Sequence, residues 1–262
     1  MSTLLQLQGV GLHFAGSVVL DSVDFDVPEG ALVSLIGPNG AGKTSLFNCI
    51  TGFYKPQKGS IQLGGRETLR MKPHQVTTLG IARTFQNVRL FREMTVLENV
   101  MSGMHCRTHA GVISSVLGLP AQRREEAEIK RFSEECLTFV GINENWARDA
   151  TTLAYGWQRR VEIARALATK PKLLLLDEPA AGLTSSEKED LIGLIRRIRD
   201  ERGIAVLLIE HDTGLVMRIS ERITVLDHGV MIAEGTPKEI QSNPKVIEAY
   251  LGVEDGEDAL GL

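Results

Sequence analysis

The sequence predicts an α/β fold with an antiparallel β subdomain at the N-terminus and an inserted helical subdomain. Short, almost purely apolar runs are typical of parallel strands that lie buried between helices. These runs are Leu32 to Ile36, Leu173 to Leu176, Ala205 to Ile209 and Ile223 to Leu226. Segments with helical character separate them, which favours a mostly parallel sheet. No such run occurs between Glu93 and Ala168.

The N-terminal segment is expected to form antiparallel strands with one face in water. Leu5 and Leu7 alternate with glutamines, and the apolar residues from Val23 to Val27 alternate with aspartates. A period of two places the apolar side chains on one face of a sheet. This pattern differs from that of the buried runs and indicates a separate β subdomain.

Helices are expected at Lys43 to Thr51, Ser185 to Arg202 and Thr213 to Glu221, each after one of the buried runs. A further helical stripe of apolar residues extends from Ala127 to Val140 amid charges. A loop from His105 to Pro120, rich in glycine, serine and histidine, is predicted to be mobile.

The predicted organisation has three parts. Residues 1–87 and 169–252 form the α/β core with its antiparallel subdomain, and residues 88–168 form the helical subdomain. Residues 253–262 are an acidic tail that is predicted to be disordered.

Composition excludes several classes of protein. The chain has 262 residues, of which 43% are hydrophobic and 24% charged, as in ordinary globular proteins. A net charge of −4 argues against a broad basic surface, so no nucleic-acid partner is expected. The apolar runs are much shorter than the roughly 20 residues of a membrane-spanning helix, and the N-terminus lacks a secretory pattern. We therefore expect the chain to stay in the cytoplasm.

The cysteines suggest reduced thiols rather than a metal site. Cys49, Cys106 and Cys136 are widely spaced and odd in number. Cys106 and His109 form a Cys-x-x-His pair, but no second pair of ligands accompanies it. A solvated loop is therefore favoured over metal binding.

A phosphate-binding loop is predicted directly after the first buried run, which indicates a P-loop NTPase core. The loop and the start of its helix are Gly37, Pro38, Asn39, Gly40, Ala41, Gly42, Lys43, Thr44 and Ser45. Glycines let backbone N–H groups surround phosphate oxygens, and the helix that follows offers its positive end. Lys43 is expected to contact the β- and γ-phosphates, and the Thr44 hydroxyl to bind Mg²⁺.

Two carboxylates follow the second buried run. Asp177 and Glu178 stand at its C-terminal end, where open α/β sheets bind their ligands. Asp177 is expected to hold Mg²⁺, and Glu178 to orient and polarise the attacking water. Beside a phosphate loop, this interpretation is favoured over an ordinary turn after a strand.

With these motifs, the chain resembles the nucleotide-binding subunits of ATP-binding-cassette transporters over nearly its whole length. The resemblance places Phe14 where the family stacks a ring on adenine. It places Gln86 where a glutamine links Mg²⁺ and water to the membrane subunits, and His211 where a switch histidine contacts the γ-phosphate. It implies ATP and Mg²⁺ as cofactors and hydrolysis at a dimer interface.

The family signature, usually Leu-Ser-Gly-Gly-Gln, reads Leu153-Ala154-Tyr155-Gly156-Trp157 in this chain. The resemblance implies that Gly156 contacts ATP held by the partner's phosphate loop. Ala154, however, has no hydroxyl to offer to the γ-phosphate. Thr184 stands where the family has an aspartate, which puts the usual contact across the dimer in doubt.

Finer features resemble one ATPase of the branched-chain amino acid importers. They are the segments Arg83 to Asn87 and Phe91 to Val96, the Leu-x-Tyr-Gly signature and the ending from Asn243 to Gly252. The resemblance implies a peripheral subunit on the cytoplasmic face of the cell membrane. Its implied partners are integral membrane permease subunits, a second ATPase subunit and, indirectly, a periplasmic binding protein. A heterodimer is expected, with a homodimer as the alternative.

Other functions within the resemblance are import of urea or amides and export of lipopolysaccharide. A soluble cassette ATPase that acts on ribosomes or DNA is a further alternative. The chain has one phosphate loop, and the segment from Lys43 to Asp177 is too short for a long coiled coil, so both observations argue against it. The presence of Glu178 and His211 argues against a subunit that binds ATP without turnover.

Overall fold

The structure, a computed structural model, describes residues 2–14, 16–107 and 120–251. The chain divides into a core unit, Met1–Arg83 with Lys172–Leu262, and a helical unit, Thr84–Pro171. The predicted acidic tail, most of the predicted mobile loop, and His109 of the Cys-x-x-His pair lie outside the described residues. The domain boundaries predicted at 88 and 168 stay predictions.

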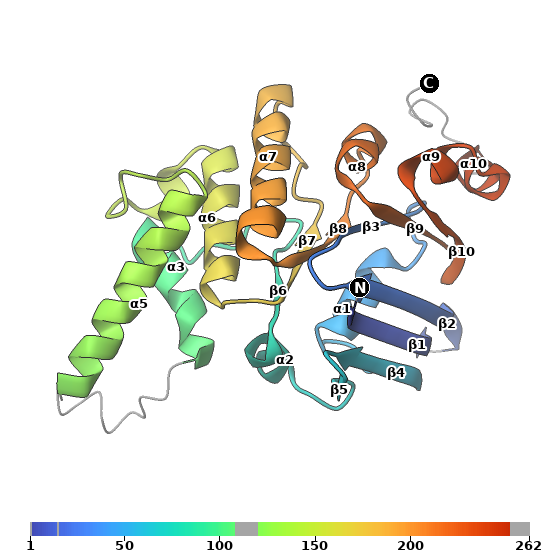
Figure 1. The fold of residues 1–262 in the computed structure, drawn as a ribbon, viewed down its shortest axis with the longest axis horizontal. Coiled ribbons are helices and arrows are strands. Elements are labelled where there is room, and N and C mark those ends of the chain that lie inside the picture. The colour runs from blue at the N-terminus through green and yellow to red at the C-terminus, as the bar shows by residue number, and fades with distance from the viewer. Residues whose placement is uncertain (1, 15, 108–119, 252–262) are drawn as a thin grey trace. The chain divides into compact units, whose positions relative to one another are not determined.

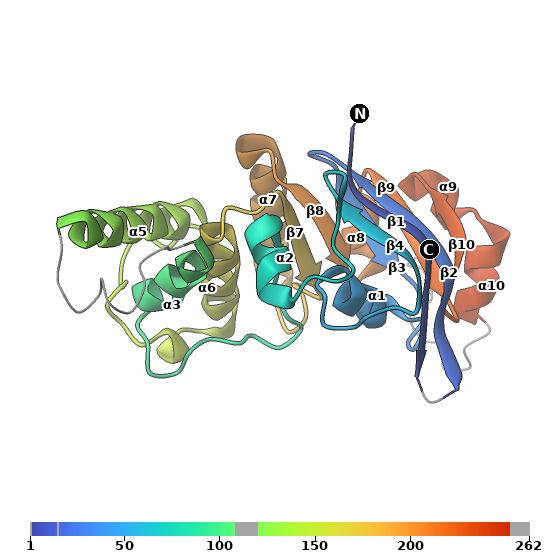
Figure 2. The same ribbon diagram turned by 90° about the horizontal axis from the view of Figure 1, so that it is seen from below.

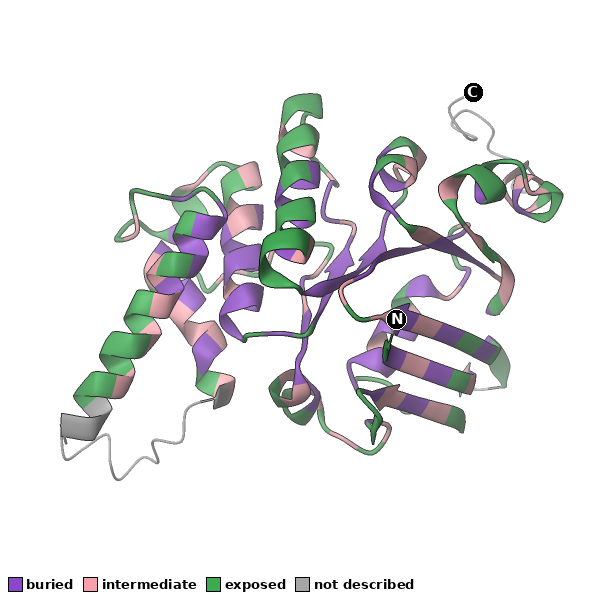
Figure 3. Ribbon diagram, viewed as in Figure 1, coloured by how far each residue is buried: buried purple, intermediate pink, exposed green. Residues whose placement is uncertain are grey.

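In its described part, the core unit contains a six-stranded sheet with the order β10-β9-β3-β8-β7-β6 (Figure 1). The strands are β3 (Leu32–Ile36), β6 (Ile81–Arg83), β7 (Leu173–Asp177), β8 (Ala205–Ile209), β9 (Arg222–Asp227) and β10 (Val230–Gly235). Strand β10 pairs antiparallel with β9, and the other neighbours are parallel. Strands β3, β7 and β8 are buried along their whole length (Figure 3), which explains their almost purely apolar sequences.

The same unit contains the predicted antiparallel sheet, in the order β2-β1-β4-β5 (Figure 2). Its strands are β1 (Thr3–Phe14), β2 (Ser17–Pro28), β4 (Lys58–Leu63) and β5 (Arg66–Glu67). The alternating residues Leu5, Leu7, Val23, Phe25 and Val27 are all buried, as their spacing predicted. Strand β4 lacks an obvious alternation because polar residues and a glycine precede its two inward side chains.

Helices cover both faces of the parallel sheet. They are α1 (Lys43–Ile50), α2 (Pro73–Leu79), α7 (Ser185–Arg202), α8 (Thr213–Ile219), α9 (Pro237–Gln241) and α10 (Pro244–Leu251). Side chains of α1 join both sheets in one core cluster, whereas α8, α9 and α10 pack with β3 and β9 in another. Helix α8 ends before the predicted Glu221 because Ser220 is extended, and the Ser220 hydroxyl hydrogen bonds that of Ser34 at 2.6 Å.

The helical unit contains α3 (Val96–Met104), α5 (Pro120–Phe139) and α6 (Tyr155–Ala168), which contact one another. Two short 3₁₀ helices, His105–Arg107 and Ala150–Thr152, lie between them. Of the predicted stripe, Cys136 on α5 and Val140 just after this helix are buried. Ile129 and Phe132 are half-buried, and Ala127 is exposed. No helix among the described residues of the chain has the length and hydropathy needed to cross a membrane.

Candidate active site

The phosphate loop begins where β3 ends, and its glycines have backbone conformations that a side chain would disturb. Gly37 has φ 150°, and a Cβ there would lie 1.9 Å from the carbonyl oxygen of Leu226. Gly42 has φ 104°, and its Cβ would lie 2.9 Å from the carbonyl oxygen of Val19. Without these Cβ atoms the backbone turns tightly into the N-terminus of α1. Such a turn presents backbone N–H groups to an anion.

Lys43 places a buried cation against this loop. Its Nζ donates to the carbonyl oxygens of Gly37 at 2.6 Å and Pro38 at 2.9 Å. Burial lowers the pKa of Lys43, and the nearby carboxylates of Glu178 and Asp177 oppose this shift. The lysine is therefore close to both acidic groups that the sequence predicted for the site.

The other residues of the loop differ in their access to a ligand. Asn39 and Gly40 are exposed at its tip, and Ala41 is buried. Thr44 is exposed and Ser45 is half-buried in the first turn of α1. Both hydroxyls therefore lie at the helix end where phosphate or a phosphate-bound cation is expected.

Asp177, at the end of β7, is held by Arg83, whose partnership with it the sequence did not reveal. Arg83 Nη2 lies 2.7 Å from Asp177 Oδ2, and Arg83 Nη1 donates to Asn48 Oδ1 at 2.6 Å. The guanidinium also lies 5.5 Å from the ring centroid of Phe47. Asn48 and Phe47 belong to α1, so Arg83 joins Asp177 to the helix that follows the phosphate loop. Arg83 ends β6, which pairs with β7, and this pairing of strands is not visible in the sequence.

Glu178 and His211 form a direct pair. Glu178 Oε1 and His211 Nε2 lie 2.6 Å apart, although the residues follow different strands, β7 and β8. Glu178 has φ 47°, a left-handed conformation that is uncommon for a residue with a side chain. Its N–H donates to the carbonyl oxygen of Ile209 at 2.8 Å, which anchors this conformation to β8.

Glu210 directly precedes His211 and was not predicted from the sequence. It is 5% exposed, and its two carboxylate oxygens accept from Ala180 N at 2.7 Å and His211 N at 3.0 Å. Burial raises the pKa of Glu210, whereas the N–H groups of Ala180, His211 and Asp212 lower it. Glu210 thus fastens the segment after Glu178 to the segment that carries His211.

Lys188 and Asp212 form a second link between the same two segments. Lys188 Nζ, from α7, lies 2.6 Å from Asp212 Oδ2, and Asp212 Oδ1 caps α8 by accepting from Leu215 N at 3.0 Å. The hydrogen bond with Lys188 lowers the pKa of Asp212. The positions of α7 and α8 are therefore joined beside the site.

The donor set of the core unit would suit Mg²⁺ together with a nucleotide. Among the residues that the structure describes, no group of three or more His, Cys, Asp or Glu side chains could hold a metal alone. Mg²⁺ commonly binds through one or two protein oxygens and the phosphates of its substrate. The exposed Thr44 hydroxyl and the Asp177 carboxylate are oxygen ligands of this kind.

Phe14 ends β1 and is 45% exposed. Tyr54 packs against it edge to face, with ring centroids 5.1 Å apart and an interplanar angle of 76°. An exposed aromatic face can stack on a base. Tyr54 was not among the predicted residues, because it lies far from Phe14 in the sequence.

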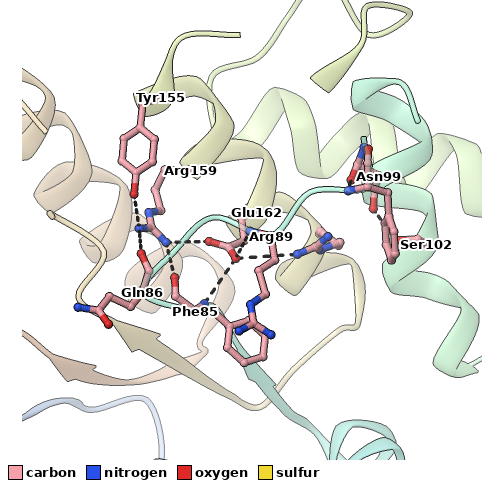
Figure 4. A network of polar contacts seen from close by, with 10 residues as sticks. Phe85, Gln86, Arg89, Asn99, Ser102, Tyr155, Arg159 and Glu162 are labelled. Carbon is pink, nitrogen blue, oxygen red and sulfur yellow. Dashed lines mark hydrogen bonds and ion pairs between the residues drawn. The ribbon is translucent and has the colours of Figure 1, made fainter. Parts of the chain in front are cut away.

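Gln86 belongs to the helical unit, whereas the phosphate loop belongs to the core unit. Figure 4 shows its side chain directed away from Arg159, while its backbone carbonyl accepts from Arg159 Nη2 at 2.6 Å. The Gln86 side chain is exposed. Its backbone is fixed and its amide is accessible.

A family model described as ABC transporter matches residues 20–181. The high-affinity branched-chain amino acid transport ATP-binding protein BraF of Pseudomonas aeruginosa is 47% identical over 249 residues, which cover 95% of this chain and 98% of that protein. The chain belongs to the ATP-binding cassette transporter family. This membership confirms the predicted resemblance, the P-loop ATPase fold and the ATPase activity.

Further comparisons agree with the finer resemblance. A model described as branched-chain amino acid ATP-binding cassette transporter matches residues 230–256 of this cassette. LivG of Escherichia coli strain K12, a high-affinity branched-chain amino acid transport ATP-binding protein, is 46% identical over 95% of this chain and 98% of its own length. A crystal structure of the ADP conformation of an ATP-binding cassette has a TM-score of 0.84 at 32% identity. That match covers 96% of this chain and 100% of the other.

The signature of this cassette lies at the start of α6. Ala154 is the N-cap residue and supplies no side-chain hydrogen bond to the helix. Gly156 is half-buried in the first turn. The Gln158 amide donates to the carbonyl oxygens of Thr151 at 3.1 Å and Leu153 at 2.7 Å, which fixes the turn before the helix. The uncapped N-terminus of α6 is suited to an anion.

Thr184 of this cassette acts as a helix cap. It is the N-cap of α7, and its hydroxyl donates to Glu187 Oε2 at 2.8 Å. In return, Glu187 N donates to the Thr184 hydroxyl at 3.4 Å. The Thr184 hydroxyl is thus engaged within its own helix.

Proposed function

We propose that the chain is the ATP-hydrolysing subunit of an importer of branched-chain amino acids. One observation supports hydrolysis: Glu178 contacts His211 at the end of the sheet from which the phosphate loop also starts. The similarity to two branched-chain amino acid transport ATP-binding proteins over nearly their full length supports the substrate.

In this proposal the core unit binds the nucleotide from base to γ-phosphate. Phe14 stacks on adenine, and the backbone of the loop from Gly37 to Gly42 binds the phosphates. Lys43 offers its charge to the β- and γ-phosphates, and Ser45 supports the loop from α1. Because the loop is preformed by its glycines, it orders the phosphates with little rearrangement.

In the core unit, the residues proposed for the reacting end come from the ends of β3, β7 and β8. Mg²⁺, when bound with ATP, neutralises charge on the phosphates, and Thr44, Asp177 and Gln86 are the proposed ligands. Glu178 accepts a hydrogen bond from the attacking water and polarises it. His211 contacts the γ-phosphate while its ring is held beside Glu178.

The proposed site is completed across a dimer, and Gly156 supplies backbone contact to the partner's ATP. We propose a second, different ATPase subunit as the partner. Permease subunits dock on the helical unit, a periplasmic binding protein delivers the amino acid to them, and the chain is peripheral to the cytoplasmic face of the cell membrane.

The segment from Gln86 to Glu98 offers the docking surface in this proposal. Phe91 is 51% exposed, and Met94 is also exposed. The buried Asn99 holds both from below, because it accepts from Phe91 N at 2.8 Å and donates to the carbonyl oxygens of Phe91 and Met94. Exposed apolar side chains on a fixed backbone favour a protein partner.

Transport by a reconstituted complex tests the proposed function. The chain is combined in vesicles with the permease, ATPase and binding-protein subunits proposed as its partners, and uptake of labelled leucine, isoleucine, valine, urea and acetamide is measured. Branched-chain amino acid uptake that requires ATP is expected. Uptake of urea or acetamide alone would overturn the substrate, and ATP hydrolysis without any uptake would overturn the importer.

A further inference from the structure

Arg159, on α6, is a buried cation whose guanidinium bonds residues of its own helix and of a segment outside it. It is 1% exposed. Its Nη1 donates to the carbonyl oxygen of Phe85 at 2.6 Å, and its Nη2 donates to that of Gln86 at 2.6 Å. Both acceptors are backbone atoms of the segment that carries the Gln86 amide (Figure 4). The guanidinium therefore fixes this segment to α6.

Glu162 completes the connection from the next turn of α6. Its Oε2 lies 2.8 Å from Arg159 Nη1, and its Oε1 accepts from the N–H groups of Phe85 and Arg89, each at 3.4 Å. Burial raises the pKa of Glu162, and the charges of Arg159 and Arg165 lower it. A buried pair of this kind tolerates the loss of one partner poorly.

Tyr155 brings the signature turn to the same guanidinium. Its hydroxyl accepts from Arg159 Nη2 at 3.0 Å, and the guanidinium carbon lies 5.7 Å from its ring centroid. One nitrogen, Nη2, thus bonds both the Gln86 carbonyl and the Tyr155 hydroxyl. Tyr155 stands where the usual signature has a glycine, which has no side chain to make this contact.

The geometry assigns to Arg159 the role of a positioning residue, and we propose that it links the Gln86 segment to the signature turn through Tyr155. A planar guanidinium holds several acceptors in fixed directions. A displacement of the Gln86 segment therefore displaces Tyr155, which is 40% exposed at the start of α6. That a permease causes the displacement rests on the proposed function, whereas the link itself does not.

Hydrogen exchange on the full-length chain tests the link without any transport partner. The Tyr155→Phe variant removes one hydroxyl from an exposed ring. Arg159→Lys keeps the positive charge but removes the two Nη donors of the guanidinium. Ser102→Ala is the matched control, because the Ser102 hydroxyl donates to the Asn99 carbonyl at 2.6 Å within the same unit but outside the link. Folding is checked by circular dichroism and thermal unfolding.

We expect the amides of residues 85–89 to exchange about tenfold faster in Arg159→Lys and about threefold faster in Tyr155→Phe, with no change in the control. Unchanged exchange in a folded Tyr155→Phe variant would overturn the link. If Arg159→Lys does not fold, Tyr155→Phe decides alone.

The transport assay tests the transmission of movement. The number of amino acids imported per ATP hydrolysed is expected to fall at least about threefold in Tyr155→Phe, with an unchanged KM for ATP. A merely structural defect would lower import and hydrolysis together. A ratio equal to that of the wild type would reject transmission through Tyr155. Absence of import by the wild type would instead contradict the proposed function, and the exchange result would still decide the link.

Discussion

Glu178 Oε1 and His211 Nε2 lie 2.6 Å apart, and Glu210, the residue before His211, binds the N–H of Ala180 two positions after Glu178. This pair of residues is therefore fixed twice, once through its side chains and once through its backbone. Neighbouring parallel strands β7 and β8 bring the two segments together. The following predictions test what each connection contributes.

Glu178→Gln keeps the size of the side chain and removes the charge that we propose polarises the attacking water. ATP is expected to bind with nearly unchanged affinity, while kcat falls by about 100-fold or more. Equilibrium binding and single-turnover hydrolysis measure the two effects, with Glu189→Gln on the exposed part of α7 as the control. Rapid hydrolysis by Glu178→Gln would place the catalytic base elsewhere.

Lys43→Ala removes the buried cation of the phosphate loop. We expect hydrolysis to fall about 1000-fold or more, because the β- and γ-phosphates lose a charge partner in a site shielded from water. Steady-state hydrolysis at saturating ATP is the measurement, and the exposed Lys238→Ala variant is the control. Turnover by Lys43→Ala at the rate of the wild type would contradict the assigned phosphate loop.

Glu210→Gln leaves a group of the same shape but with only one carbonyl oxygen. Both carboxylate oxygens accept from backbone N–H groups, so the amide must face one of these donors with its NH₂. One unmatched buried N–H costs about 1–3 kcal/mol, and kcat is expected to fall about tenfold with little change in KM. Glu239→Gln, at an exposed helix cap, is the control. A raised KM with normal kcat would assign Glu210 to ATP binding instead.

Phe91→Asp tests the proposed docking surface. A charge at an exposed apolar position weakens docking on a permease but disturbs no buried contact of the core unit. Transport by the complex is expected to fall at least about tenfold, while ATP binding by the isolated chain is retained. Val230→Asp, at another exposed apolar position, is the control. Unchanged transport by Phe91→Asp would show that the permease does not dock on this surface.

The two ATP sites of the proposed heterodimer are expected to differ. Ala154 lacks a hydroxyl, and the nearby polar groups are engaged: the Tyr155 hydroxyl with Arg159, and the Gln158 amide with backbone carbonyls. One missing hydrogen bond to a charged group is worth about 1.5–3 kcal/mol, so the site completed by this signature is expected to hydrolyse about ten- to 100-fold more slowly.

Single-turnover hydrolysis by the assembled transporter checks this difference. The catalytic glutamate is replaced by glutamine in one ATPase subunit at a time. Glu178→Gln is expected to remove most of the hydrolysis, because Glu178 serves the site that the partner's signature completes. Equal losses from the two replacements would show that the sites are equivalent.

Local patterns in the sequence indicated the candidate residues that lie next to one another in the chain, whereas Phe14, Gln86 and His211 came from the family resemblance. Lys43 and Thr44 follow closely spaced glycines, and Asp177 and Glu178 follow an apolar strand, so local patterns were sufficient. The parallel sheet and the helical insertion were likewise visible in the hydrophobic period.

The supporting residues were hidden because their partners lie far away in the sequence. Arg83 reaches Asp177 only because β6 and β7 are neighbours, and Glu210 reaches Ala180 only because β7 and β8 are. A buried arginine such as Arg159 looks like any charged residue on an exposed helix face until α6 is packed. Secondary-structure propensity and hydrophobic periodicity do not reveal such contacts between distant residues.

At Glu178, the left-handed backbone opposes the stability of the fold to the presence of a carboxylate. Glycine adopts φ 47° without hindrance, so it would relieve about 1 kcal/mol of strain there and abolish the carboxylate at the same time. The same exchange would also remove the contact with His211 Nε2. The proposed chemistry of this position therefore needs a side chain where the backbone conformation favours glycine.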